Sequence, residues 1–395
     1  MSSPDHQPAA VPRPVKGLAL VSLFNDFASE MVYPLLPAFV TVYLGAGAVA
    51  LGVLDGAADL TSSALKLVSG RLADRPGWRK PLILAGYGTA ILVRPLVAVA
   101  GAAWQVVGFR VIDRVGKGLR TPPRDALIAA VTPPASRGRS FGFHRAADHF
   151  GAVLGSLAAW YLLSLGADVR RVIAWSGAPG LLAFAVLAVV LRDRQTARDV
   201  PSSQATGLDA AGKIFWAPVT VLAALTFVRL PETLFLLYLQ QQGLPIPLVP
   251  LAWAGLHVVR SLSSYPGGRF ADRMGASAGV AASGLLFAGT MAALAFARGP
   301  GAAVAVFLVL GLATGLTEAA ERSLIAALAP VRTGRRFGAY HALTGFAALP
   351  AGLAFGLVYQ KLGGSGALLV SAGGTMVAVL AWVLVSPRPF AGGRA

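Results

Sequence analysis

The chain has 395 residues, of which 55% are hydrophobic and only 13% are charged, and its mean hydropathy is +0.66. Soluble domains carry about 25% charged residues, so this composition excludes an ordinary water-soluble core. The chain contains no cysteine, which excludes disulfides, thiolate metal sites and cysteine nucleophiles.

The apolar residues come in runs of about 20, separated by short basic or Gly/Pro-rich joints. Runs of this length predict helices that cross a membrane. We therefore expect an all-α membrane protein with twelve transmembrane helices. The predicted spans are 17–44, 48–69, 81–100, 103–130, 138–165, 171–191, 214–242, 247–266, 277–297, 301–329, 335–360 and 364–386.

The formal net charge of +17 follows from where the basic residues lie. Most Lys and Arg residues outside the spans are in the N-terminal segment, the even-numbered joints and the C-terminal tail. The odd-numbered joints and the residues that border them hold only Arg170, Arg171, Arg298 and Lys361. This asymmetry is typical of the positive-inside rule and predicts that both termini are cytoplasmic. Basic joints facing anionic lipid explain the charge, so we expect a multi-pass protein of the cytoplasmic membrane without a nucleic-acid partner.

Span 1 carries two carboxylates within its apolar sequence. Asp26 and Glu30 are four residues apart and therefore share one helix face. At a rise of about 1.5 Å per residue, both lie well inside the bilayer. We expect Pro34 and Pro37 to kink the later part of this helix.

The next four spans carry charges three, four or seven residues apart, a spacing that aligns them in stripes on their helices. Span 4 is the most polar of the twelve. The ionisable residues of spans 2 to 5 include Asp55, Asp59, Lys66, Arg94, Arg110, Asp113, Arg114, Lys117, His144, Arg145, Asp148 and His149.

The longest polar interruption, residues 192–213, lies near the centre of the chain and predicts a flexible linker. The expected order is a cytoplasmic N-terminal tail at 1–16, a six-helix bundle at 17–191, this cytoplasmic linker, a second six-helix bundle at 214–386 and a cytoplasmic tail at 387–395. The second bundle has fewer charges within its spans: Arg229, Glu232, His257, Arg260, Glu318, Glu321, Arg322 and His341.

Two sequence elements recur in the two halves of the chain at almost the same offset. Gly70-Arg-Leu-Ala-Asp-Arg-Pro-Gly77 returns 198 positions later as Gly268-Arg-Phe-Ala-Asp-Arg-Met-Gly275. The segment 139–146 aligns with 335–342, at an offset of 196. Two six-helix halves in the same order and orientation form a parallel pseudo-repeat.

A Gly-x-apolar-Ala-Asp-Arg-x-Gly turn that tightly joins two membrane helices resembles the signature loop of the major facilitator superfamily. There the loop joins spans 2 and 3 and, in weaker form, spans 8 and 9. The resemblance covers residues 17–386 and is closest in kind to bacterial efflux-type permeases. It implies two bundles around a central cavity and transport by alternating access. Arg110 matches the arginine of the family's fourth-span motif, which is linked there with proton transfer, whereas Asp113 and Arg114 replace its usual glutamine and glycine.

Charges deep in a bilayer are costly, so they face protein or a water-filled cavity. One interpretation is that they pair with one another and hold the bundle together; the other is that they line a wet passage. Carboxylates that meet the two aqueous phases in turn can load a proton on one side and release it on the other, and histidine can relay it. The candidates for proton coupling are Asp26, Glu30, Asp148 and His149.

Substrate contact is the second role that we assign to these charges. Arginines can hold a carboxylate or phosphate through two hydrogen bonds. The near balance of acidic and basic groups leaves the sign of the substrate open. The candidates for the substrate cavity are Arg94, Arg110, Asp113, Arg114, Arg229, Glu232, Arg260 and Glu318.

The resemblance gives the signature loops a separate role as a cytoplasmic gate. It implies that Asp74 lies at the start of span 11, where the helix dipole favours an anion, with Arg336 as its basic partner. It also implies that Asp272 faces Arg139 at the start of span 5, and that these contacts break when the cytoplasmic side opens. The alternative is that the loop charges only set topology. The gate candidates are Gly70, Asp74, Arg75, Gly77, Arg139, Asp272 and Arg336.

The sequence has no Walker loop, no His-Glu-x-x-His run and no cysteine ligands, so we expect neither an enzyme nor a metal or cofactor. We predict a monomeric secondary active transporter of a small-molecule solute in the lipid bilayer, with proton-coupled efflux as the first choice by family analogy. Proton-coupled uptake of an anionic metabolite, suggested by the arginine-rich span 4, is one alternative. A non-transporting membrane receptor or a lipid flippase is another.

Overall fold

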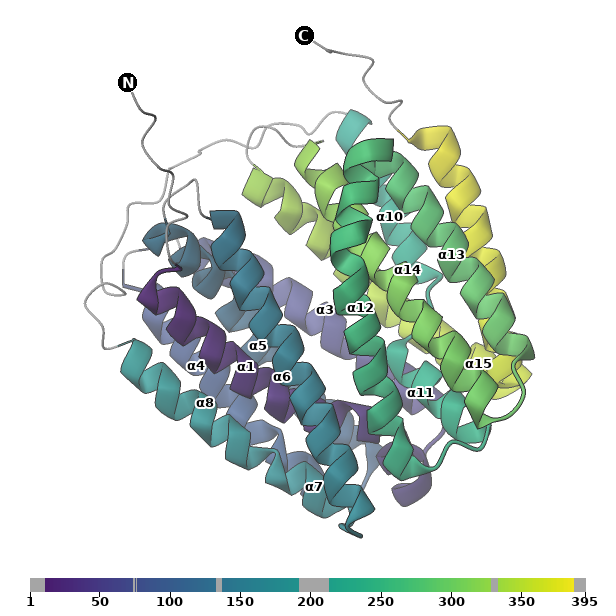
Figure 1. Ribbon diagram of the computed structural model, residues 1–395, viewed down its shortest axis with the longest axis horizontal. Coiled ribbons are helices and arrows are strands. Elements are labelled where there is room, and N and C mark those ends of the chain that lie inside the picture. Colours follow the sequence, from purple (N-terminus) through teal and green to yellow (C-terminus); the bar gives the residue numbers. More distant parts are fainter. Residues whose placement is uncertain are drawn as a thin grey trace, which may run out of the picture.

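The computed structural model describes residues 11–73, 75, 77–132, 137–191, 213–327 and 333–386. These residues form two bundles of helices that lie side by side (Figure 1). The N half consists of α1 (Arg13–Val32), α3 (Ala48–Ala73), α4 (Arg79–Val93), α5 (Ala103–Val131), α6 (Arg137–Ser164), α7 (Val169–Trp175) and α8 (Gly177–Val190). The C half consists of α10 (Lys213–Phe227), α11 (Glu232–Gln241), α12 (Val249–Met274), α13 (Ala276–Phe296), α14 (Pro300–Ala327) and α15 (Thr333–Val385).

Helix α1 begins and α15 ends at the same end of the molecule (Figure 1). We call this the termini end and the opposite side the far end. Each predicted span lies on helical structure, so the all-α expectation is confirmed for the described residues. Eight helical stretches among them are long and apolar enough to cross a membrane. The predicted division of the chain into tails, bundles and a linker stays a prediction, and residues 1–10, 192–212 and 387–395 lie outside the described part.

The breaks in two spans, and the break between two others, have causes that the sequence explains. After α1, the chain continues through a 3₁₀ turn at Tyr33–Leu35, the short α2 (Leu36–Ala38) and a π-helical segment at Phe39–Tyr43, because two prolines remove backbone donors there. Between α10 and α11, the helix is broken just before Pro231. Spans 11 and 12 are both contained in α15, whose backbone breaks at Gly363 with φ = 71°, a value that favours glycine.

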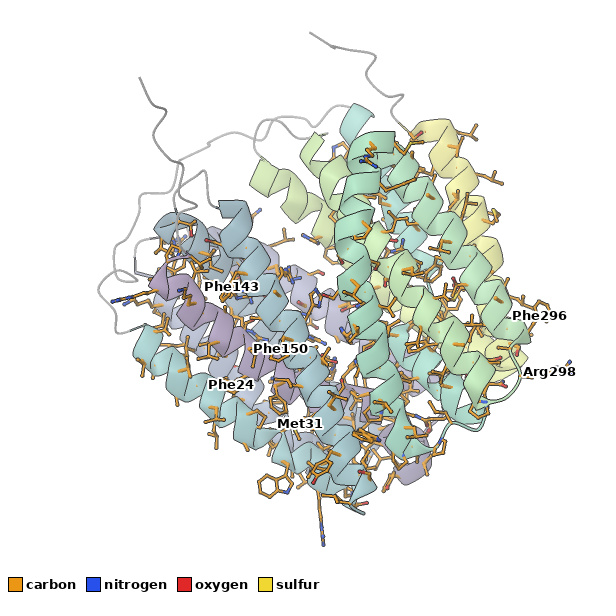
Figure 2. All side chains as sticks on the ribbon, viewed as in Figure 1. Phe24, Met31, Phe143, Phe150, Phe296 and Arg298 are labelled. Carbon is orange, nitrogen blue, oxygen red and sulfur yellow. The ribbon has the colours of Figure 1, made fainter. Side chains whose placement is uncertain are left out.

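Large apolar side chains cover the outside of both bundles. Phe143 and Phe150 on α6 are 43% and 57% exposed, and Phe296 at the end of α13 is 73% exposed (Figure 2). Water-soluble monomers rarely expose apolar surface on this scale. A lipid-facing surface explains it, in agreement with the apolar composition of the helices.

Apolar packing joins the two halves at the far end. One buried cluster contains residues of both halves, among them Leu36 and Leu51 of the N half and Leu234 and Trp253 of the C half. At the termini end, the described side chains form two separate clusters, one within each half. The far end is therefore closed by a core that the halves share, whereas each half has its own core at the termini end.

A close crossing between the halves lies within this closed end, where α3 packs along α15. A Cβ atom added to Gly52 would lie 1.9 Å from the carbonyl oxygen of Gly352, and one added to Gly352 would lie 2.0 Å from that of Gly52. The two backbones are thus in direct contact. Only glycine at both positions permits this contact, as at close crossings of membrane helices generally.

We expect Gly52→Val to force the halves apart at the far end, because its side chain would overlap backbone rather than a movable side chain. Spin labels on Gly47→Cys and Leu362→Cys, at open or exposed far-end positions of this cysteine-free chain, should report a longer distance. Gly108→Val on α5 is the matched control, since a Cβ there meets nothing within 4 Å. An unchanged distance in Gly52→Val would contradict the close crossing.

Candidate functional site

A cavity of about 520 Å³ lies between the two halves. Apolar residues of the shared core, including Leu230, Phe235, Phe287 and Leu310, close it toward the far end. More than half of the remaining lining residues are ionisable. The acidic and basic side chains that line it are Asp26, Glu30, Asp55, Asp59, Asp148, Glu232, Glu321, Arg110, Arg114, Lys117, Arg145, Arg229 and Arg260, together with His149 and His257.

The cavity contains most of the residues predicted for proton coupling and substrate contact. All four candidates for proton coupling line it: Asp26, Glu30, Asp148 and His149. Of the substrate-cavity candidates, Arg110, Arg114, Arg229, Glu232 and Arg260 line it. The side chain of Glu318 lies outside the described residues.

Two predicted cavity residues, Arg94 and Asp113, lie outside the cavity. They form a buried ion pair in which Arg94 Nε lies 2.9 Å from Asp113 Oδ1, and they do not line the cavity. Arg94 also donates a 2.7 Å hydrogen bond to the carbonyl of Asn25, and Arg110 Nη1 lies 3.6 Å from Asp113 Oδ2. Asp113 thus neutralises two arginines and ties α4, α5 and α1 together. The prediction of a cavity position is corrected for this pair, because the α5 stripe is wide enough to face both the cavity and α4.

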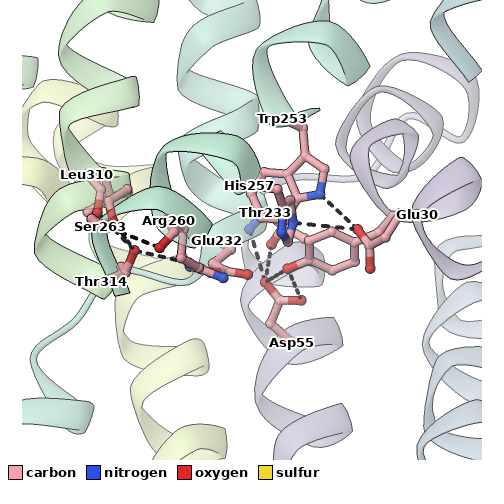
Figure 3. Close-up of polar contacts among 12 residues, drawn as sticks. Glu30, Asp55, Glu232, Thr233, Trp253, His257, Arg260, Ser263, Leu310 and Thr314 are labelled. Atoms are coloured by element: carbon pink, nitrogen blue, oxygen red, sulfur yellow. Dashed lines mark hydrogen bonds and ion pairs between the residues drawn. The ribbon is translucent and has the colours of Figure 1, made fainter. Parts of the chain in front are cut away.

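The charges on the C-half wall are paired within that half. Arg260 Nη2 lies 2.8 Å from Glu232 Oε1, and its Nε donates a 3.0 Å hydrogen bond to Thr314 (Figure 3). Arg229 Nη2 lies 3.5 Å from Glu321, which also accepts the hydroxyl of Tyr340. These pairs join α11 and α12 to α14, so this wall has ion pairs rather than an excess of one charge.

The N-half wall presents the basic stripe of α5 to the cavity. Arg110, Arg114 and Lys117 all line it, and the guanidinium of Arg110 lies 4.8 Å from the ring centre of Tyr33. The Nε atoms of Arg110 and Arg114 are buried without a hydrogen-bond partner among the described residues. Buried donors of this kind have unused capacity to bind water or a ligand.

Glu30 connects the two halves at the level of the cavity. Its Oε2 accepts a 2.8 Å hydrogen bond from the indole of Trp253 on α12 and lies 4.0 Å from Nε2 of His257 (Figure 3). The His257 ring packs edge-on against Trp253, with centroids 5.0 Å apart, and lies 6.5 Å from the ring of His149 on α6. Two predicted proton-coupling residues therefore meet a histidine of the other half. His257 was not among the predicted site residues, although an ionisable residue within a span is a sufficient signal.

The other two proton-coupling candidates have partners within the N half. Asp148 lies 3.5 Å from Nδ1 of His144 and 3.6 Å from Arg145 on its own helix. Asp26 accepts a 2.9 Å hydrogen bond from the amide of Asn25. Both carboxylates still border the cavity, so they can meet water in it.

Asp55 also reaches across to the C half, and sequence reasoning did not select it as a site residue. Its Oδ2 accepts hydrogen bonds from the backbone N–H and the hydroxyl of Thr233 on α11, at 3.0 and 2.7 Å (Figure 3). The hydroxyl of Tyr33 lies 3.2 and 3.3 Å from its two oxygens. No sequence signal identifies this contact, because its partners are 178 positions apart.

The predicted cytoplasmic gate is described only in part. Gly77 and Gly275, which end the two signature loops, both have a positive φ, 80° and 89°. The whole of Asp74 lies outside the described residues, and so do the side chains of Arg139, Asp272 and Arg336. Of the other gate candidates, Arg75 is exposed and Gly70 lies in α3 near Pro122 of α5. The gate stays a prediction.

Known proteins share both the sequence pattern and the fold. The profile of the Major Facilitator Superfamily matches residues 18–260, more than half of the chain. An uncharacterised MFS-type transporter of Methanocaldococcus jannaschii is 24% identical over 352 residues, which are 87% of this chain and 87% of that protein. The multidrug resistance protein MdtH of Edwardsiella ictaluri is 32% identical over 148 residues, 38% of this chain and 36% of MdtH.

Solved transporters have the same architecture of two helical bundles. The xylose transporter XylE from E. coli superposes with a TM-score of 0.73 at 16% identity, covering 96% of this chain and 98% of XylE. The nucleoside transporter NupG gives a TM-score of 0.77 at 13% identity, covering 95% of this chain and all of NupG. Together with the match to the family profile, these likenesses confirm the predicted fold, and the chain belongs to the major facilitator superfamily.

Proposed function

We propose that this chain exports a small solute across the cytoplasmic membrane in exchange for protons. Membership of a transporter superfamily makes it a membrane transporter and not an enzyme. The observation that carries the proposal is the cavity between the halves, whose walls combine ionisable side chains with a floor that both halves share. In alternating access, such a floor separates when the bundles rock and forms again on the opposite side.

Proton coupling is supported by the carboxylates at the cavity surface. Glu30 is the strongest of the four candidates, because its contacts with Trp253 and His257 exist only while the two halves are close at this level. A proton that binds to or leaves Glu30 changes the strength of these contacts, and so links protonation to the position of the bundles. Asp26, Asp148 and His149 border the same cavity and remain candidates.

Export is supported by relatives rather than by geometry. Several partial relatives are named as multidrug resistance proteins, and 38% of this chain is covered by one of them. The basic joints support an orientation in which the termini end is cytoplasmic. In that orientation the far end, where the shared core lies, faces the outside. We propose that the monomer is sufficient for transport, because the cavity is formed by a single chain.

The proposal is tested with purified protein in liposomes that contain a pH-sensitive dye and have an acidic lumen. Ethidium, norfloxacin and chloramphenicol serve as cationic, zwitterionic and neutral probes. We expect at least one probe to accumulate in the lumen while protons leave it, and accumulation to stop when the gradient is collapsed. Accumulation that is the same with and without the pH gradient would contradict proton coupling. If none of the probes is transported, export of drug-like solutes is contradicted.

Proton-coupled uptake of an anionic metabolite is the second candidate, supported by the unused Nε donors of Arg110 and Arg114 in the cavity wall. Guanidinium groups bind carboxylate and phosphate more strongly than neutral ligands. The same liposomes distinguish the two functions when benzoate and glycerol 3-phosphate are added as anionic probes. Uptake predicts that protons enter the lumen together with the anion, whereas export predicts that protons and solute move in opposite directions.

A further inference from the structure

Helix α11, the far-end part of span 7, begins without a cap of its own. Pro231 is the residue directly before the helix, and its side chain has no atom that can accept a hydrogen bond. The first turn of any helix leaves backbone N–H groups without partners within the helix. Serine, threonine, aspartate and asparagine are preferred directly before a helix, because their side chains accept a hydrogen bond from one of these N–H groups.

Asp55 supplies the missing acceptor from the other half of the molecule. Its carboxylate binds the N–H of Thr233, the second residue of α11, at 3.0 Å and the hydroxyl of the same residue at 2.7 Å (Figure 3). Thr233 is fully buried, so water does not replace this partner while the far end is closed. The negative charge also lies at the end of the helix that the backbone dipole makes positive.

The position of this contact ties it to closure of the far end. Asp55 lies one turn beyond Gly52, where α3 crosses α15 with the backbones in contact. Leu51 and Leu54 on one side and Leu234 on the other belong to the core that the halves share. Because donor and acceptor belong to different halves, the hydrogen bonds break when this core separates.

We propose that Asp55 is a gating residue: it caps α11 across the interface, holds the far end closed, and must release α11 for the far end to open. Its role in a transport cycle rests on the proposed function. The contact itself requires neither a substrate nor a particular direction of transport. The test below uses none of them, so its failure would leave the proposed function untouched.

The chain contains a matched control for the charge of Asp55. Asp59 lies one turn further along the same helix and lines the same cavity. Among the described residues, it has no hydrogen bond or ion pair to the C half, and its side chain is exposed. Asp55→Asn and Asp59→Asn therefore remove the same charge from neighbouring turns, but only the first weakens a contact between the halves.

The experiment measures how often the far end opens. Ala48→Cys places a single thiol on α3 in the closed region, where a Cβ added to Gly356 of α15 would lie 3.1 Å from the carbonyl of residue 48. The thiol is buried, so a charged, membrane-impermeant maleimide reacts only when the far end opens. The labelling rate in liposomes, at low reagent concentration, is then proportional to the open fraction. Ala183→Cys, fully buried inside the N half, monitors general loosening.

Asp55→Asn should raise the labelling rate of Ala48→Cys by roughly tenfold, as expected for the loss of a hydrogen-bonded charge. Thr233→Val, which removes the hydroxyl and keeps the N–H, should raise it by a smaller factor. The double variant should exceed Asp55→Asn only slightly, because both changes act on one contact. Asp59→Asn should leave the rate unchanged, and Ala183→Cys should label slowly in every background.

Three outcomes would overturn the proposal. One is an unchanged rate in Asp55→Asn. Another is an equal rise in Asp59→Asn, which would attribute the effect to cavity charge. The third is a rise in labelling of Ala183→Cys in both Asp55→Asn and Thr233→Val, which would show that these changes loosen the whole bundle rather than the gate.

Discussion

Replacing Asp113 by asparagine is expected to lower the free energy of unfolding by about 3–5 kcal/mol. The carboxylate is 2% exposed and neutralises two arginines, with Arg94 at 2.9 Å and Arg110 at 3.6 Å. Without it, two guanidinium groups remain buried with no opposing charge, which is far less favourable than a complete ion pair. Thermal unfolding in detergent, followed by intrinsic tryptophan fluorescence, measures the effect as a lower midpoint.

Asp125→Asn is the matched control for this prediction. Asp125 lies 2.9 Å from Arg124, the same separation as in the buried pair, but its side chain is 39% exposed. The guanidinium of Arg124 is buried, but water reaches the Asp125 carboxylate and weakens its contribution to the pair, so we expect a smaller shift of the midpoint than in Asp113→Asn. Equal shifts in the two variants would mean that burial does not decide the strength of the Asp113 pair.

Glu30→Gln is expected to abolish accumulation of a transported probe in response to a pH gradient. Glutamine has the size of glutamate and still accepts a hydrogen bond from Trp253, but it cannot bind and release a proton in the physiological range. Exchange of labelled for unlabelled probe across the membrane should persist, because it requires bundle movement without net proton transfer. Liposome uptake with and without a gradient measures both activities.

Asp59→Asn serves as the control, since Asp59 lines the same cavity and its side chain makes no hydrogen bond or ion pair with the C half among the described residues. It should retain accumulation driven by the gradient. Full accumulation in Glu30→Gln would exclude Glu30 as the coupling group and leave Asp26, Asp148 and His149 as candidates. Loss of exchange as well would indicate a structural role for Glu30 instead.

Several properties of this protein follow from the sequence by itself. The length of the apolar runs requires helices that cross a membrane, because a backbone in lipid must satisfy its hydrogen bonds internally. The recurrence of the Gly70–Gly77 loop 198 positions later indicates two similar halves. Charges such as Asp26, Glu30 and Arg114 within apolar runs predict a wet cavity, since they are too costly to face lipid. These inferences depend only on local composition and spacing.

The tertiary structure decided which of the charges face the cavity and which are paired away from it. Sequence spacing places Arg110, Asp113 and Arg114 on one stripe of α5. This stripe is wide enough to face two neighbours, so Asp113 pairs with Arg94 at the end of α4, whereas Arg114 lines the cavity. It also decided that Glu30 contacts Trp253 and that Asp55 caps α11. Such partners are about 180 to 220 positions apart and come together only when the two halves pack against each other, so no local pattern records them.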